Sequence, residues 1–363
     1  MSEPPYDDVV ADDGIIRTAL IGFGLAGSVF HSPLIAATPG LRLETIVSSD
    51  PERQRRARLA HPDASIINRI DDFHALARDH ALVVVATSNR QHAPLARAAL
   101  EAGLAVVVEK PMAPTSLEAR ELVELARRRG CLLTAFHNRR WDSEILTLRR
   151  LLAENRLGVV AQVESRFERW RPEVATQWRE SADPRDAGGV LFDLGTHLVD
   201  QAVHIFGRPI GVYAELRRRR PGAMVDDDDF VALQHEAGVS VHLWTSLIAA
   251  HPGPRLLVRG LRGTYVKETL DEQEDALRTG ARPSGADWGR EPPERWGTFF
   301  DGAGSTRVES ERGDWPQFYS QLVAALRGTG PVPVAPEDAV AVLEVLEAAK
   351  ESARTSQVVS LPA

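Results

Sequence analysis

The feature that most constrains the fold of this chain is a series of short apolar runs between residues 15 and 136. Each run precedes a stretch with helical spacing or closes the series, and the runs lie in IIRTALIGFG, LRLETIVSS, ALVVVATSN, AVVVEKP and LLTAFHN. Apolar runs without polar alternation are typical of strands buried on both faces, as in a parallel sheet covered by helices. The repeated β–α alternation therefore predicts a doubly wound α/β domain over residues 15–136.

The pattern changes after about residue 150. Segments such as VVAQVESRFERW and FVALQHEAGVSVHLWTSLIA alternate apolar and polar residues, which is the period of an antiparallel sheet with one buried face. We predict a second α/β domain over residues 137–363, with a large, open, mostly antiparallel sheet. Residues 1–14 are acidic and rich in proline and glycine, which predicts a disordered tail. The acidic run 226–229 is predicted to be a solvated loop.

Composition narrows the classes of function. A formal net charge of −8 argues against nucleic acid or an anionic membrane as the main partner. The single Cys131 excludes an intrachain disulfide framework and a cysteine metal cluster, which fits a reducing compartment. No apolar stretch has the length of a membrane span. We therefore expect a cytoplasmic protein of two domains.

A glycine-rich loop follows the first predicted strand. In IGFGLAG, Gly22, Gly24 and Gly27 have G-x-G-x-x-G spacing, with Leu25 and Ala26 between the last two. The first glycine permits a tight turn, the second lets the backbone approach a pyrophosphate, and the third lets the helix pack on the strand. Because the loop lies in the first β–α unit, we predict that it binds a dinucleotide.

The end of the second predicted strand bears on which dinucleotide binds. Ser48 and Ser49 occupy the position where NAD enzymes carry a ribose-binding acid, and Asp50 is placed to cap the helix that follows. Arg53, one turn into that helix, could neutralise a 2′-phosphate. This arrangement favours NADP. In the alternative, Asp50 bonds to the ribose and the cofactor is NAD.

A lysine at a strand end is unusual in this chain. Of 43 basic residues only Lys110, Lys267 and Lys350 are lysines, and Lys110 follows Glu109 at the end of the run AVVV. Lysine differs from arginine because its ammonium is a compact donor whose pKa shifts on burial. We interpret Lys110 as a residue selected for its chemistry.

A second group of polar residues lies in DLGTHLVD. Asp193 and His197 are four residues apart, so on a helix they share a face, and a carboxylate beside an imidazole orients it as a general base. Two alternatives are an ordinary surface pair and a metal site completed by Asp200. We predict no metal, because the spacing matches no zinc motif.

In their order along the chain, IGFGLAG, ATSNRQH, EKPMAPT and DLGTHLVD resemble the glucose–fructose oxidoreductase, inositol dehydrogenase and MocA (Gfo/Idh/MocA) family. The resemblance covers the chain from about residue 15 and implies a Rossmann domain followed by an α/β domain. More narrowly, FHSPLI, NRRWDS and LDEQE resemble the NADP-dependent scyllo-inositol dehydrogenase branch. The sequence departs from that branch at Thr196, where a proline is usual.

The resemblance assigns roles to the motif residues. Lys110 would reach the substrate hydroxyl beside the nicotinamide, Asp193 would bind substrate, and His197 would be the catalytic histidine. The cofactor-binding set would further comprise Thr87, Asn89, His92 and Glu109. Arg139, Trp141 and Trp170 are candidates for the wall of the substrate pocket, and core packing is an alternative for the two tryptophans.

The implied reaction is hydride transfer between a polyol or sugar and NADP. His197 would remove the hydroxyl proton while Lys110 donates to the developing oxygen charge, although either could be the formal base. The family also implies a homodimer or homotetramer formed through the open sheet. Alternative functions are a nucleotide-binding sensor without turnover and a glycosidase that uses bound NAD.

Overall fold

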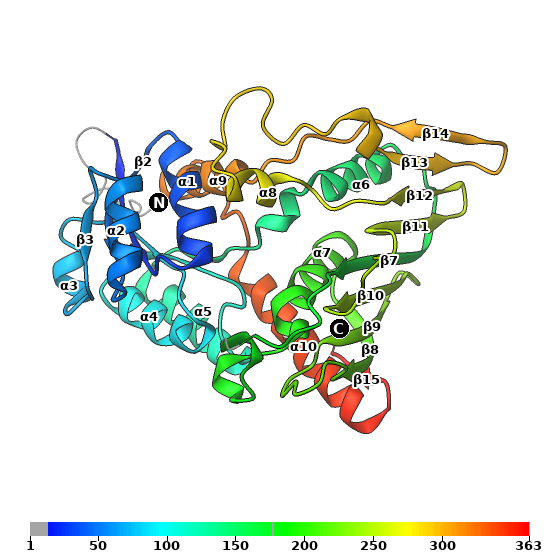
Figure 1. Cartoon of the computed structure of the whole chain (residues 1–363), viewed down its shortest axis with the longest axis horizontal. Coiled ribbons are helices and arrows are strands. Elements are labelled where there is room, and N and C mark those ends of the chain that lie inside the picture. The colour runs from blue at the N-terminus through cyan, green and yellow to red at the C-terminus, as the bar shows by residue number, and fades with distance from the viewer. Residues whose placement is uncertain (1–13, 176–177, 363) are drawn as a thin grey trace. The chain divides into compact units, whose positions relative to one another are not determined.

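A computed structural model describes residues 14–175 and 178–362 of the chain (Figure 1). The predicted tail therefore lies outside the described residues, except for Gly14. The chain divides into two compact units. The first comprises residues 1–138, 273–287 and 315–339, and the second comprises residues 139–272, 288–314 and 340–363. The division into a domain of residues 15–136 and a domain of residues 137–363 stays a prediction.

The first unit contains a parallel sheet of six strands, in the order β3-β2-β1-β4-β5-β6. Their bounds are Ile16–Ile21 (β1), Leu41–Val47 (β2), Ser65–Ile67 (β3), Leu82–Val85 (β4), Ala105–Val108 (β5) and Leu133–Ala135 (β6). Every residue of β4 and β5 is buried, as expected for strands covered on both faces. The predicted doubly wound sheet is confirmed.

The order of the strands reverses between β1 and β4. Right-handed crossovers run outward from this point in opposite directions, so the two sets of helices cover opposite faces of the sheet. The helices are α1 (Ser32–Ala37), α2 (Pro51–Ala60), α3 (Phe73–Leu76), α4 (Asn89–Glu101), α5 (Ser116–Arg129), α8 (Gln273–Arg278) and α9 (Pro316–Leu326). Ligands of open α/β sheets bind where the strand order reverses, beyond the carboxyl ends of the strands.

The second unit contains a sheet of nine strands, in the order β14-β13-β12-β11-β7-β10-β9-β8-β15. Its pairs are antiparallel, except that β7 and β10 run parallel. The bounds are Val160–Glu168 (β7), Pro209–Arg217 (β8), Asp228–His235 (β9), Ser240–Ser246 (β10), Leu256–Gly260 (β11), Gly263–Lys267 (β12), Gly297–Phe300 (β13), Ser305–Val308 (β14) and Val359–Ser360 (β15). The large, mostly antiparallel sheet predicted for the second domain is confirmed.

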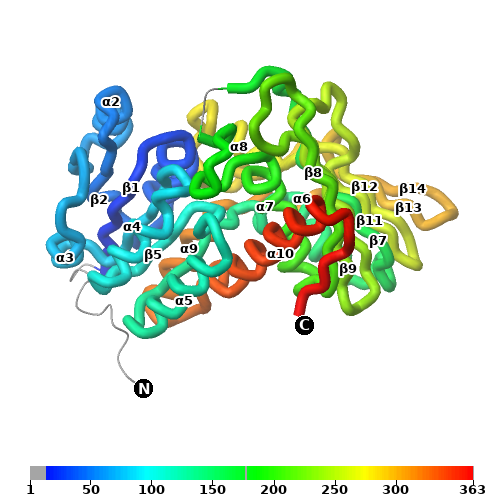
Figure 2. The backbone as a smooth tube through the Cα atoms, turned by 90° about the horizontal axis from the view of Figure 1, so that it is seen from below, coloured from blue at the N-terminus to red at the C-terminus, as the bar shows by residue number. Residues whose placement is uncertain are grey.

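Helices lie against one face of this sheet. They are α6 (Ser143–Ala153), α7 (Thr196–Phe206) and the part of α10 (Pro336–Thr355) that belongs to the second unit. Helix α7 packs on β7 and β10. Helix α10 lies beside β8 (Figure 2), where Ser352 Oγ accepts a hydrogen bond from the Ala214 amide at 2.9 Å. Within the described part of the chain, no helix is long and apolar enough to cross a membrane.

The acidic run Asp226–Asp229 is not a solvated loop, so that prediction was wrong. Asp227 is fully buried and pairs with Arg220, and Asp229 is buried in β9. The Asp226 carboxylate accepts from the Leu191 amide at 2.8 Å. A run of carboxylates predicts solvation only when no buried donors face it, and Arg220 and the backbone amides are the donors here.

The buried Arg255 joins α7 to α6 and to β7. The guanidinium of Arg255 donates to Glu144 of α6 at 2.9 Å, to Ser165 of β7 at 2.6 Å and to Gln201 of α7 at 2.9 Å. Arg255 is 3% exposed and Glu144 is fully buried. The planar guanidinium supplies several donors in fixed directions, which a lysine could not do. Arg255 therefore fixes α7 relative to the sheet.

Replacing Arg255 by methionine should destabilise the protein by about 3–5 kcal/mol, because it leaves the Glu144 carboxylate buried without its cation. The measurement is the free energy of unfolding from urea titration. Arg259→Met, four residues further along the chain in β11, is the matched control, because Arg259 is exposed and its pair with Glu164 lies at the surface; it should cost less than about 1 kcal/mol. Equal losses for the two variants would contradict this account.

Candidate functional site

Two glycines of the loop after β1 are required by the packing of the protein itself. Gly22 has a φ of +100°, and a Cβ placed on it would lie 2.3 Å from the Ala86 carbonyl oxygen at the end of β4. A Cβ on Gly27 would lie 2.0 Å from the Gly22 carbonyl oxygen. The backbones of β1, β4 and the following helix therefore approach so closely that only glycine fits at both positions.

Gly24 is different. The nearest atom to a Cβ placed there is Nη1 of Arg53 at 3.6 Å, an ordinary van der Waals contact. The packing of the protein alone would therefore tolerate alanine at this position. Leu25 beside it is 42% exposed, and Ala26 begins a π-helical turn, Ala26–His31, that continues into α1. The loop fits a pyrophosphate at the start of this helix.

The end of β2 is arranged as the sequence predicts. Asp50 caps α2, because its carboxylate accepts from the Arg53 amide at 3.0 Å, and this bond lowers the pKa of Asp50. Ser48 is buried and Ser49 is exposed. The Arg53 guanidinium lies beside Gly24, although Asp50 Oδ2 is 3.7 Å from its Nε. These positions put a cation next to the glycine-rich loop.

The loops after β4 and β5 are tied together by His92. Its Nδ1 lies 2.8 Å from the Pro111 carbonyl and its Nε2 lies 3.3 Å from the Thr87 carbonyl. Burial lowers the pKa of His92, and the two carbonyls only partly oppose this effect. Asn89, in the first turn of α4, is also buried. Thr87, Asn89 and His92 thus lie at the carboxyl end of β4, beside the glycine-rich loop.

Glu109 and Lys110 follow β5 directly. Glu109 is buried: its Oε1 lies 3.1 Å from His31 Nε2, and its Oε2 accepts from the Lys110 amide at 2.9 Å. Burial opposes ionisation, but the hydrogen bond and charge of His31 outweigh it and hold the pKa of Glu109 below its usual value. The Lys110 side chain is half-buried.

Asp193 and His197 belong to the second unit. Asp193 lies in a π-helical turn, Leu191–Gly195, and His197 is in the first turn of α7. The Asp193 carboxylate accepts from Arg179 Nε at 3.2 Å. His197 is 8% exposed, and its ring centroid is 6.2 Å from that of Phe167. Single turns of π-helix are frequent at functional sites.

The predicted pocket-wall residues have different environments. Arg139 is buried beside Asp142, and its guanidinium carbon lies 4.7 Å from the centroid of the Phe167 ring. Arg139 and His197 therefore both contact Phe167. Trp141 is 7% exposed and packs in the interior, whereas Trp170 is 57% exposed.

Thr196, where the resembled branch has proline, donates through its hydroxyl to the Phe192 carbonyl at 2.7 Å and is fully buried. Its hydroxyl is therefore satisfied within the helix.

The metal alternative concerns Asp193, His197 and Asp200. The described residues contain no group of three histidine, cysteine or acidic side chains that could hold an ion. Asp200, the third candidate ligand, forms a buried two-pronged ion pair with Arg140 at 2.6–3.1 Å.

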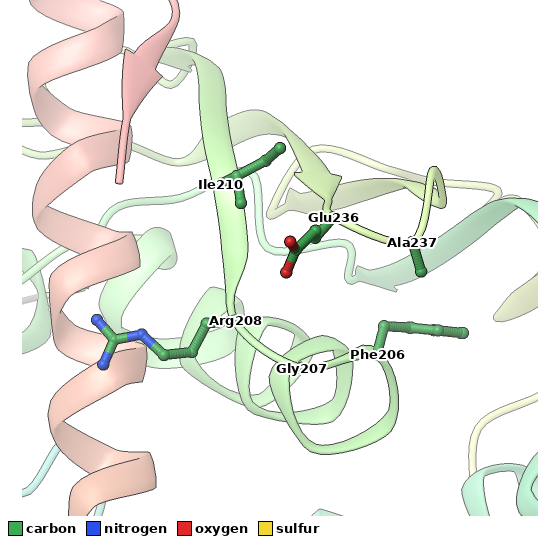
Figure 3. Close-up of a pocket in the computed structure, with 6 residues that line it drawn as sticks. All are labelled: Phe206, Gly207, Arg208, Ile210, Glu236 and Ala237. Atoms are coloured by element: carbon green, nitrogen blue, oxygen red, sulfur yellow. The ribbon is translucent and has the colours of Figure 1, made fainter. Parts of the chain in front are cut away.

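A surface hollow lies at the end of α7 (Figure 3). Glu236 points into it, while Arg208 extends toward α10 and pairs with Glu344. Its lining comprises Phe206, Gly207, Arg208, Ile210, Glu236 and Ala237. None of the predicted site residues lines this hollow.

Three contacts at the candidate sites were missed from sequence. Arg179, bonded to Asp193, lies fourteen positions away in a short 3-10 turn, Trp178–Glu180. Phe167 looked like an ordinary buried position of a strand. His31 stands in the motif FHSPLI, which was noted only as part of the resemblance, and its bond to Glu109 spans 78 positions. The motif was the signal that could have singled out His31.

Comparison with known proteins identifies the family of the chain. Residues 16–137 match the family model described as the NAD-binding Rossmann fold of the GFO_IDH_MocA oxidoreductase family, and residues 149–361 match its C-terminal alpha/beta domain. The uncharacterized oxidoreductase YdgJ of Escherichia coli is 42% identical, over 93% of this chain and 96% of its own length.

Two further relatives come from Bacillus subtilis. The scyllo-inositol 2-dehydrogenase (NADP(+)) IolW is 33% identical over 95% of this chain and 96% of its own length. The solved structure of the oxidoreductase yvaA superposes with a TM-score of 0.90 at 31% identity, covering 96% of this chain and 99% of the other.

Substitution by alanine should have different effects at Gly24 and at Gly27. Gly24→Ala should leave the melting temperature unchanged and weaken dinucleotide binding at least about 10-fold, because its methyl group meets only a ligand. Gly27→Ala should lower the melting temperature, because its methyl group collides with the Gly22 carbonyl. Thermal melts and cofactor titrations of both variants measure this. A Gly24→Ala protein that binds dinucleotide as the wild type does would contradict the assignment.

Proposed function

Because the chain belongs to the Gfo/Idh/MocA oxidoreductase family, we propose that it transfers a hydride between NADP and a carbinol of an inositol-like polyol or sugar. The chain is a nicotinamide-dependent dehydrogenase acting on CH–OH groups. The main support for NADP as the cofactor and for an inositol-like substrate is the match over nearly the whole chain to an NADP-dependent scyllo-inositol dehydrogenase. Retention of Lys110, Asp193 and His197 supports it.

The glycine-rich loop and the strand ends beside it would hold the cofactor. Gly24 leaves room for a pyrophosphate, and Thr87 and Lys110 lie at the ends of the neighbouring strands. The bound nicotinamide would supply the acceptor or donor of the hydride. The residues of the chain orient the reactants and move the proton.

The proposal gives the catalytic side chains separate tasks. His197 takes the proton of the substrate hydroxyl, and Lys110 donates to the oxygen on which negative charge develops. Asp193 binds a neighbouring hydroxyl, and its bond to Arg179 fixes its carboxylate. Arg139, Trp141 and Trp170 are proposed to shape the pocket. Arg139 has the strongest support, because it shares Phe167 with His197.

The preference for NADP rests on charge near Gly24. Arg53 lies beside that glycine, and Arg56 of the same helix donates to Ser28 at 3.3 Å. Asp50 is engaged in capping α2. A 2′-phosphate at Ser48 and Ser49 would meet a cation and hydroxyl donors there, rather than a carboxylate that repels it.

We propose that the protein forms a homodimer or homotetramer through the sheet of the second unit. On the face opposite α7, Phe230, His242 and Trp244 form an aromatic cluster with ring centroids 5.2–6.0 Å apart. The Arg166 guanidinium carbon lies 4.0 Å from the Trp244 centroid. Aromatic and arginine side chains like these, which are partly exposed on a sheet, are enriched in protein interfaces.

The single cysteine is consistent with a reducing, cytoplasmic setting.

The function predicts NADPH formation when the protein is given NADP and scyllo-inositol, myo-inositol, glucose or xylose. Lys110→Ala and His197→Asn should each lower kcat by about 10²–10⁴ fold, because each removes a group that acts in the proton transfer. The absorbance of NADPH follows the reaction.

Lys350→Ala and His204→Asn are the controls, since they remove the same residue types elsewhere in the second unit and should keep wild-type rates. NADP binding without turnover on any polyol or sugar would contradict the proposal and favour a nucleotide-binding sensor. Release of a sugar without net NADPH would favour the glycosidase.

If Arg53 contacts the 2′-phosphate of NADP, Arg53→Gln should weaken the binding of NADP and not that of NAD. NADP affinity should fall about 10- to 100-fold, because a charged hydrogen bond to phosphate is lost, while NAD affinity stays unchanged. Arg55→Gln on the same helix is the control, because Arg55 pairs with Glu52 at the surface. Equal loss of NAD and NADP affinity in Arg53→Gln would refute the phosphate contact.

If the subunits associate through this face, Trp244→Asp should separate them, because a charge replaces an aromatic side chain in the proposed interface. Light scattering on a sizing column measures the mass of wild type and variant. A wild-type mass of a single chain would contradict the interface.

A further inference from the structure

The motif FHSPLI has a structural role in the first unit that the proposed reaction does not use. His31 is fully buried at the end of the π-helical turn after the glycine-rich loop. Its Nε2 lies 3.1 Å from Glu109 Oε1, and its Nδ1 lies 2.6 Å from the hydroxyl of Tyr319 in α9. Tyr319 is also fully buried. Three side chains distant in sequence thus form one buried hydrogen-bonded chain.

The direction of the bond between His31 and Glu109 follows from the chemistry of the groups. A carboxylate only accepts, so Nε2 of His31 carries a proton and donates to Glu109. Burial, with the nearby charge of Glu109, raises the pKa of Tyr319 well above its usual value, so its hydroxyl stays protonated and shares a hydrogen bond with Nδ1 of His31. The second carboxylate oxygen of Glu109 accepts the Lys110 amide at 2.9 Å.

The surroundings of His31 restrict its movement. Its ring centroid is 4.3 Å from that of Phe136, and Phe136 in turn contacts Phe318 at 4.8 Å. The imidazole is therefore held between an aromatic side chain and two hydrogen-bond partners. A group held in this way transmits its position to the carboxylate that it contacts.

We propose that His31 and Tyr319 are positioning residues, which hold the Glu109 carboxylate and, through the Lys110 amide, the lysine that acts in the reaction. The inference rests on the proposed function for the role of Lys110 in catalysis. It also explains why the motif lies where it does: the turn that ends at His31 begins at the glycine-rich loop, so one short segment contacts both the predicted cofactor site and the lysine loop.

The position of the Lys110 amide can be followed without turnover. The chain has only three lysines, so labelling with ¹⁵N-lysine gives three backbone amide signals, and the Lys110 signal reports the ionisation of Glu109. The titratable groups around that carboxylate are His31, Tyr319, Lys110 and His92. His31 is the strongest influence that lowers the pKa of Glu109 against burial, so removing it should raise that pKa.

The first test compares the Lys110 amide signal of wild type and His31→Leu between about pH 5 and 8, a range above the usual pKa of glutamate. The wild-type signal should stay constant, and the variant signal should titrate within the range. His80→Leu is the matched control, because His80 is another buried histidine of this unit, bonded to Thr45 at 3.0 Å. A Lys110 signal that stays constant in all three proteins would overturn the inference.

The second test uses rates. Tyr319→Phe, which removes one oxygen, and His31→Leu should lower kcat about 10- to 100-fold, the cost of a small misplacement of a catalytic group, with substrate KM and NADP affinity little changed. His31→Gln should recover much of the loss, because its amide can donate to Glu109 and accept from Tyr319.

Tyr319→Phe keeps the inference testable if His31→Leu does not fold. Rates of Tyr319→Phe equal to those of the wild type, or no recovery in a folded His31→Gln, would overturn the positioning role. A wild-type protein that oxidises no polyol while its Lys110 signal behaves as expected would instead refute the proposed function and leave the hydrogen-bonded positioning of Lys110 in place.

Discussion

The approach of three backbone segments at the point where the strand order reverses is the constraint on which the first unit depends. Gly22 faces the Ala86 carbonyl, and Gly27 faces the Gly22 carbonyl, at separations that leave no room for a Cβ. This contact brings the ends of β1 and β4 to the start of the first helix. Gly24 then remains open toward a ligand, and His92 joins the loops after β4 and β5 beside it. The predicted cofactor residues of this edge are neighbours because the backbones meet there.

In the second unit, buried arginines hold separate segments of the chain together. Arg140, Arg220 and Arg255 each donate to several acceptors, and each joins segments that are distant in sequence. Arg220 contacts Asp227 and Glu180 together with the carbonyls of Arg171 and Glu173. A planar group with several donors in fixed directions suits such junctions. Lysine also takes a buried structural position in this chain, because Lys267 is fully buried in an ion pair with Glu291. Rarity alone therefore marks structural as well as chemical lysines, and the case for Lys110 rests on its strand-end position and its neighbours.

Local patterns were sufficient to predict the parallel sheet, the glycine-rich loop and the capping role of Asp50, because periodicity and cap chemistry act within a few residues. The mostly antiparallel sheet also followed from alternation. Contacts between separate segments could not be predicted: Glu109 to His31, and Asp193 to Arg179. The solvated loop at Asp226–Asp229 failed because the chain turns back between Arg220 and Asp227, which brings a guanidinium and backbone amides of the preceding segment to the Asp227 carboxylate. The run of charges alone does not indicate that turn. The roles of the site residues come from the family resemblance and remain proposals.

Direct transfer of a hydride from a polyol carbinol to NADP can be followed with scyllo-inositol deuterated on its ring carbons, by mass analysis of the NADPH formed. We expect one deuterium on the nicotinamide ring per turnover and a slower reaction than with the unlabelled polyol. NADPH that forms without deuterium, or a labelled polyol recovered unchanged from a protein that binds NADP, would contradict it.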